Sequence, residues 1–122
     1  MAAIQTLGQS NHPIIEFCTI KENLCPAIQV CLGNSCSIRK NTLICNDVGI
    51  EVISGDPHIT KNVISRNLND GILTMTVDDL ACVPRIYFNN INSNRGNGIN
   101  CKGKKNHSRI GILFFSYKIR VK

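Results

Sequence analysis

Two adjacent carboxylates, Asp78 and Asp79, are the residues of this sequence that most directly suggest chemistry. Cleavage of a glycosidic bond uses a pair of carboxyl groups that act from one face on the scissile bond. Asp78 and Asp79, however, lie in a segment that lengthens one of several similar repeats, and Asp47 and Asp70 lie at expected turns. The carboxylates therefore indicate no catalytic pair.

The histidines do not supply the missing chemistry. They lie in different turn-like segments, with no nucleophile at an equivalent position: His12, His58 and His107. The Asn-Thr-Asp, Gly-His-Gly and Arg-Ile-Lys motifs that accompany an Asp-Asp pair in pectin-type hydrolases are absent. Lyase chemistry would need a basic group beside calcium-binding acids, and no such group assembles. We predict no catalytic residues, no cofactor and no enzyme activity.

Seven cysteines, five of them between Cys18 and Cys45, are numerous for a chain of 122 residues. Their spacings lack the paired C-x-x-C of a zinc site, so we predict no metal. No charged-then-apolar signal segment precedes them, and reduced thiols are then the default. We expect an intracellular protein in which the Asn106-His107-Ser108 glycosylation triplet is unused.

A basic cluster accounts for much of the net charge of +6. It consists of Lys102, Lys104, Lys105 and Arg109, and it is the candidate binding patch. Such a cluster could dock on nucleic acid, on an acidic protein surface or on anionic lipid. Alternatively it is a solvated loop that discourages edge pairing at a solenoid end. Because no aromatic stacking residues accompany the lysines, we expect no nucleic-acid partner.

Four stretches of the chain align column by column. Leading isoleucines recur at intervals of 23, 21 and 27 residues, at Ile15, Ile38, Ile59 and Ile86. The apolar positions alternate within short β-branched segments bounded by Gly, Asn, Asp and Pro, which indicates strands separated by turns. A period in the low twenties predicts an all-β fold, a short right-handed parallel β-helix of about four turns.

Asparagines occupy two further columns, expected to be structural ladders. The members are Asn23, Asn46, Asn67 and Asn94 in one column, and Asn41, Asn62 and Asn89 in the other. Asn tolerates left-handed backbone and bonds neighbouring backbone groups, so we place these residues at corners, where stacked amides bond one another. A small residue follows (Ala27, Gly49, Gly71, Gly98), where only a small side chain or a positive φ fits.

The column pattern divides the chain into three parts. Residues 13–101 form the β-helix repeats, residues 1–12 an irregular N-terminal segment, and residues 102–122 a basic loop and an irregular C-terminal tail. No stretch is long and apolar enough to span a membrane. An open solenoid end invites pairing, so we expect possible end-to-end self-association.

The repeats resemble a known class. The pattern Ile-x-x-Asn-x-Ile-x-x-Asn-x-x-x-Gly-Ile-x-Val is similar to the carbohydrate-binding and sugar-hydrolysis β-helix repeat. The segments IEFCTIKENLCPAIQV, CSIRKNTLICNDVGIEV and VPRIYFNNINSNRGNGI, with the loop at 78–83, most resemble the C-terminal β-helix of the Shc-binding-protein family. Similar repeats occur in F-box proteins that recognise ubiquitination substrates. The resemblance covers about residues 13–101 and does not include the helical regions of either group.

The resemblance implies a non-enzymatic intracellular interaction module, a scaffold linked to cytoskeletal, spindle or cell-division complexes, located in the cytoplasm or nucleus. The expected partner is a protein, with a glycan as the alternative. Two other functions stay open: a glycan-binding module or degenerate carbohydrate-active enzyme, and a substrate-recognition fragment of a ubiquitin ligase. The contact surface would be formed by outward strand residues such as Thr19, Arg39, Glu51, Thr60, Arg85 and Tyr87.

Overall fold

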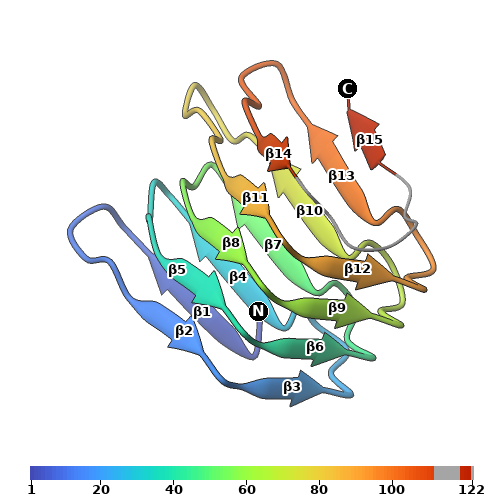
Figure 1. Ribbon diagram of the computed structural model, residues 1–122. Helices are drawn as coiled ribbons and strands as arrows, with labels where there is room; N and C mark the ends of the chain where they lie inside the picture. Colours follow the sequence, from blue (N-terminus) through green and yellow to red (C-terminus); the bar gives the residue numbers. More distant parts are fainter. Residues whose placement is uncertain (112–118, 122) are drawn as a thin grey trace.

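The computed structural model describes residues 1–111 and 119–121, and every regular element among them is a β-strand (Figure 1). This part of the chain therefore contains no helix that could cross a membrane. The strands form three parallel sheets that wind as a right-handed β-helix. The prediction of an all-β right-handed parallel β-helix is confirmed, but the helix has about five turns rather than four.

Each of the first four turns contributes one strand to each sheet, and the described part of the chain beyond them adds β13, β14 and β15. Sheet A contains β1 (Ile4–Leu7), β4 (Ile28–Cys31), β7 (Ile50–Ile53), β10 (Ile72–Met75), β13 (Ile99–Lys102) and β15 (Ile119–Val121). Sheet B contains β2 (Ile14–Glu16), β5 (Ser37–Arg39), β8 (His58–Thr60), β11 (Arg85–Tyr87) and β14 (Arg109–Gly111). Sheet C contains β3 (Thr19–Lys21), β6 (Thr42–Ile44), β9 (Val63–Ser65) and β12 (Asn90–Asn92).

The core consists of apolar columns that run along the solenoid axis. In sheet B, for example, Ile38 pairs in register with Ile59, and Ile59 with Ile86. Side chains alternate between the two faces of a strand, so one residue of each three-residue strand points inward. Burying an isoleucine stabilises the fold by roughly 1.5–3 kcal/mol. Ten Ile and Leu side chains are fully buried: Ile28, Ile38, Leu43, Ile50, Ile59, Ile64, Ile72, Ile86, Ile91 and Ile99.

The additional turn comes from the two segments that were expected to be irregular. Ile4 of β1 stacks on Ile28, and Ile110 of β14 stacks on Ile86. In the tail, β15 extends sheet A by pairing with β13. These strands keep the inward isoleucine but lack the Asn and Gly positions that make the central repeats recognisable, so the column pattern did not include them.

The short corner between sheets B and C has two residues in each of the four turns where the structure describes it, and its backbone differs from the expectation. The left-handed residue is the one before each asparagine of this column, or before Cys18, which takes the place of Asn in the first turn: Phe17, Lys40, Lys61 and Phe88, with φ between 56° and 58°. The asparagines themselves are buried ladder residues. Asn41 Nδ2 donates to Asn62 Oδ1 (3.0 Å), and Asn62 Nδ2 donates to Asn89 Oδ1 (3.0 Å).

The corner between sheets C and A carries the second asparagine column. Asn67 Nδ2 donates to Asn94 Oδ1 (2.8 Å), and the backbone N–H of Asn46 donates to Asn67 Oδ1 (2.9 Å). The small residues are needed for space and not for a positive φ. A Cβ on Gly71 would lie 2.7 Å from the carbonyl oxygen of Gly98 in the next turn.

The third corner, between sheets A and B, is the variable one. Its loops range from four to nine residues and comprise residues 8–13, 32–36, 54–57, 76–84 and 103–108. In Figure 1 these loops project together from the left side of the coil. The fold thus keeps two corners nearly constant and concentrates its variation on one edge.

Candidate binding surface

Several carboxylates bond to residues of the neighbouring turn. Glu16 pairs with Arg39, and Asp70 accepts hydrogen bonds from the backbone N–H of Asn97 (2.7 Å) and from Asn100 Nδ2 (3.0 Å). Asp79, in the longest loop, lies 3.5 Å from Lys105 Nζ. Its neighbour Asp78 is exposed in the same loop. The two adjacent carboxylates therefore lie on a loop at the variable corner, outside every strand.

The cysteines are structural occupants of the stack. The backbone N–H of Cys18 donates to Asn41 Oδ1 (3.0 Å), just as the backbone N–H of Asn41 donates to Asn62 Oδ1 in the next turn. Cys101 pairs in register with Thr74. All seven thiols are free. Within residues 1–111 and 119–121, no three His, Cys, Asp or Glu side chains come together as a possible metal site.

Burial governs the chemistry of the inner thiols. Desolvation raises the pKa of Cys36 and Cys82, both fully buried, and also that of Cys31. A thiol with a raised pKa stays protonated at neutral pH and is a poor nucleophile. These three cysteines are therefore packing residues, and their environment does not activate them.

The predicted basic patch is divided among three elements. Lys102 ends β13 in sheet A, while Lys104 and Lys105 lie on the following loop. Lys105 is turned toward the Asp79 loop, where its Nζ also donates to the Asp79 carbonyl (3.3 Å). Arg109 begins β14 in sheet B. The four residues are close in sequence, but the solenoid distributes them over two sheets and a corner.

Arg109 instead joins a basic column on the outer face of sheet B. It pairs in register with Arg85, and Arg85 pairs with His58 on the strand below. All three side chains are exposed. Arg85 Nη1 lies 2.9 Å from His58 Nε2, and since a guanidinium only donates, the histidine nitrogen accepts in this arrangement. Successive side chains lie about 4.8 Å apart, the spacing of paired strands.

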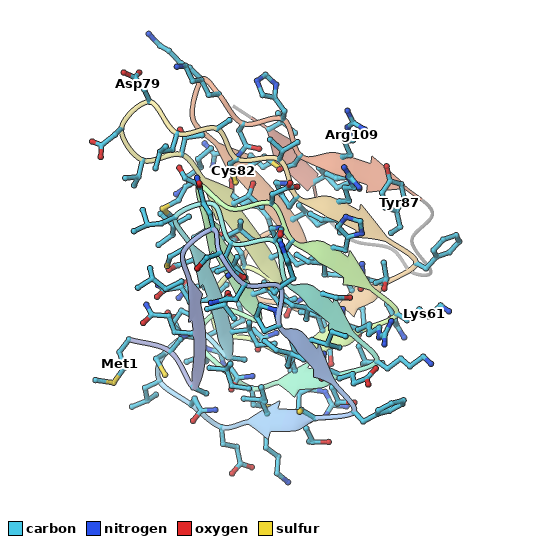
Figure 2. All side chains as sticks on the ribbon, turned by 90° about the vertical axis from the view of Figure 1, so that its left-hand side faces the viewer. Met1, Lys61, Asp79, Cys82, Tyr87 and Arg109 are labelled. Carbon is cyan, nitrogen blue, oxygen red and sulfur yellow. The ribbon has the colours of Figure 1, made fainter. Side chains whose placement is uncertain are left out.

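An aromatic side chain and a lysine flank this column. Tyr87 leaves β11 on the same face as Arg85, and its ring occupies the space that a Cβ on Gly111 would need. Lys61, exposed at the corner after β8, has a left-handed backbone. Figure 2, viewed from the variable corner, shows Arg109, Tyr87 and Lys61 along one side of the molecule. We call His58, Lys61, Arg85, Tyr87 and Arg109 the basic face.

The basic face covers only the C-terminal turns of sheet B. Lower on the same sheet, Arg39 Nε donates to Glu16 Oε2 (2.8 Å), so those charges compensate each other. Of the six residues expected on the contact surface, Arg39, Thr60, Arg85 and Tyr87 do lie on sheet B, whereas Thr19 lies on sheet C and Glu51 on sheet A. On sheet B, the uncompensated positive charges therefore lie in the C-terminal turns.

Sequence reasoning placed Arg85 on a surface but did not connect it with His58 or Arg109. A signal was present, because each of these residues directly precedes a leading isoleucine, Ile59, Ile86 or Ile110. The alignment had stopped before Ile110.

In comparisons with known proteins, no family model, curated protein or solved structure matches this chain.

Proposed function

We propose that this protein is a non-enzymatic interaction module whose basic face docks an acidic, extended segment of a partner protein. The observation that carries the proposal is the in-register column of His58, Arg85 and Arg109 beside Tyr87. The two arginine charges, one turn apart and with the neutral His58 below them, complement a linear acidic partner and speed its encounter. Arg and Tyr are also the residues most enriched among those that dominate binding energy.

Rigidity supports this function. The strands beneath the basic face are held in place on both sides, since β11 pairs with β8 and with β14. The charged groups therefore lose less backbone freedom on binding than groups on a mobile loop would. Fixed spacing along the solenoid axis also favours a partner that runs across the strands.

The biological setting that we propose is intracellular: a scaffold in cytoskeletal, spindle or cell-division complexes. Two observations support it. Seven free thiols suit a reducing compartment, and the repeats resemble those of the Shc-binding-protein family. Acidic surfaces such as those of microtubules have the charge that the basic face requires.

Charge reversal tests the proposal. The variant Arg85→Glu/Arg109→Glu is compared with the control Arg66→Glu/Arg95→Glu. The control makes the same charge change at exposed arginines of the corner between sheets C and A. The probe is a fluorescein-labelled peptide of alternating Glu and Thr, followed by anisotropy. We expect the first variant to weaken binding at least about tenfold, about 1.4 kcal/mol, and the control to change it little. If both variants weaken binding equally, the effect comes from net charge alone, and the proposal of a specific binding face is refuted.

A glycan is the second candidate, because Tyr87 provides an aromatic surface beside two arginines. An array that carries neutral and sulfated oligosaccharides distinguishes the two. A glycan function requires an oligosaccharide signal that Tyr87→Ala removes while binding of the acidic peptide persists. Absence of any oligosaccharide signal would eliminate this candidate.

A further inference from the structure

The outer face of sheet A carries an apolar column that the proposed function does not use. Leu7, Cys31, Ile53 and Met75 follow one another in register along β1, β4, β7 and β10. Alternation places them on the outer face, where Gln5 Nε2 reaches Cys31 Sγ at 3.9 Å. Leu7 is 55% exposed, and Ile53 and Met75 are partly exposed, whereas Cys31 is only 7% exposed and lies buried between Leu7 and Ile53.

The longest loop of the variable corner extends this column. Residues 76–84 form a tight turn closed by a bridge between Val77 and Leu80, whose side chains are 36% and 42% exposed. Ser54, only 1% exposed, holds the turn from below. Its Oγ accepts from the N–H of Val77 (2.7 Å) and donates to the carbonyl of Leu80 (3.0 Å).

This arrangement is unusual for a solvent-facing insertion. Ordering a loop costs conformational entropy, and here the ordered loop presents two apolar side chains to water. Figure 2 shows Asp79, at the tip of this loop, on the side of the molecule opposite Arg109 and Tyr87. Exposed apolar side chains that gather on one surface mark interaction sites, and here they flank the buried Cys31. We call Leu7, Cys31, Ile53, Met75, Val77 and Leu80 the apolar strip.

We propose that the apolar strip binds an amphipathic helix of a partner protein, lying along the solenoid axis. Successive members of the column are about 4.8 Å apart, close to the 5.4 Å pitch that separates apolar side chains on one helix face. The column from Leu7 to Lys102, which pairs with Met75, spans about 19 Å, the length of about 13 helical residues.

Charge sets the direction of the helix. The strip ends in the exposed lysines Lys102 and Lys104, whereas the lysine beside them, Lys105, is engaged by Asp79. A helix C-terminus carries partial negative charge, which nearby cations stabilise. The partner helix therefore has its C-terminal end, enriched in acidic residues, at the Lys102 end of the strip. This site lies on a different sheet from the basic face and uses different chemistry, so either surface can exist without the other.

The test selects helical peptides and then challenges the binders. A displayed library of helical peptides of about 16 residues is selected against the intact chain. We expect enriched peptides with apolar residues at i, i+4 and i+7 and with acidic residues near the C-terminus. Enriched peptides without helical periodicity would overturn the proposal.

The best peptide is then synthesised and measured by fluorescence anisotropy. Val77→Ser/Leu80→Ser should weaken binding at least about tenfold. The control Leu24→Ser/Leu68→Ser, at exposed leucines of the corner between sheets C and A, should leave binding unchanged. Thermal unfolding by circular dichroism verifies that both variants remain folded. Equal binding to wild type and to the first variant would overturn the site.

Two further measurements test the occupant and its direction. If sedimentation shows a dimer that Val77→Ser/Leu80→Ser dissociates, a second copy of this chain covers the strip and the helix proposal fails. Lys102→Glu/Lys104→Glu should weaken the acidic-ended peptide severalfold more than the same peptide with a neutral C-terminal end. Equal effects on the two peptides would refute the assigned direction.

Discussion

The corner between sheets B and C and the corner between sheets A and B perform different tasks in the same coil. Wherever the structure describes it, the first has two residues, a left-handed residue followed by a buried asparagine or, in one turn, by Cys18. The second has four to nine residues, and it includes the Asp79–Lys105 contact and the loop anchored by Ser54. One corner sets the register of the stack, and the other is free to vary.

This contrast teaches where a solenoid can acquire binding surfaces. Adding or removing one residue at the B–C corner would turn the inward apolar residue of the following strand to the outside, because side chains alternate along a strand. A change of length at the A–B corner adds residues outside the stack and leaves the register intact. Both proposed surfaces, the basic face and the apolar strip, border the variable corner.

The largest expected effect comes from breaking the B–C corner with Asn62→Ala. Asn62 Oδ1 accepts from the N–H and Nδ2 of Asn41, while its own Nδ2 donates to the Ile38 carbonyl (2.9 Å) and to Asn89 Oδ1. Several buried groups would lose their partner, each at about 1–3 kcal/mol. We expect a loss of about 4 kcal/mol or more in the free energy of unfolding, measured with urea. Asn69→Ala, at an exposed asparagine bonded to Asp47, is the control and should change little.

Gly71→Ala compares a close-packed corner with the variable one. A Cβ there would lie 2.7 Å from the Gly98 carbonyl oxygen and 2.8 Å from Asn94 Nδ2. We expect a loss of about 2–3 kcal/mol from overpacking, visible as a lower urea midpoint. Gly8→Ala is the counterpart at the variable corner, where φ is 89° and a Cβ meets no atom within 4 Å. It should cost about 1 kcal/mol, from backbone conformation alone. If Gly8→Ala proves the more harmful variant, the contrast between the corners is wrong.

Ser54→Ala tests how firmly the variable corner holds its longest loop. The change removes the two hydrogen bonds to Val77 and Leu80. We expect a loss of about 1–2 kcal/mol and faster amide hydrogen exchange confined to residues 76–84. Ser93→Ala makes the same change at an exposed serine with a similar backbone, φ 57° against 51°, and should alter neither measurement.

The smallest effect is expected for Lys105→Ser at the tip of the same corner. The contact with Asp79 is 3.5 Å long and solvent-exposed. Exposed ion pairs contribute little because water and salt screen them. Thermal unfolding should therefore coincide with that of wild type. A clear drop in the midpoint would show that this corner contributes to the stack in the way the B–C corner does.

The predictable part of this protein is the part that repeats. Ile38, Ile59 and Ile86 could be aligned from sequence because stacking places like residues on like at a nearly constant interval. The same alignment identified Asn41, Asn62 and Asn89 as neighbours. It misassigned the left-handed position by one residue, because Lys40, Cys45 and Lys61 have no side-chain feature that favours a positive φ.

The candidate surfaces were less predictable. Lys102, Lys104, Lys105 and Arg109 are neighbours in sequence, and proximity in sequence suggested one patch. In the coil, a few residues are enough to pass from one sheet to the next, so these side chains separate. Residues a full turn apart become neighbours instead, as Arg85 and Arg109 do.

The sequence by itself therefore determined the period, the inward isoleucine columns and the asparagine ladders, because each is a property of one turn that the next turn repeats. Tertiary structure decided the number of turns, the left-handed corner residues, and the union of His58, Arg85 and Arg109 on one face. It also decided the anchoring of the 76–84 loop on Ser54. These features depend on which residues pair between strands of successive turns. Because the loops between the strands differ in length, that register is defined only by the hydrogen bonds between the turns.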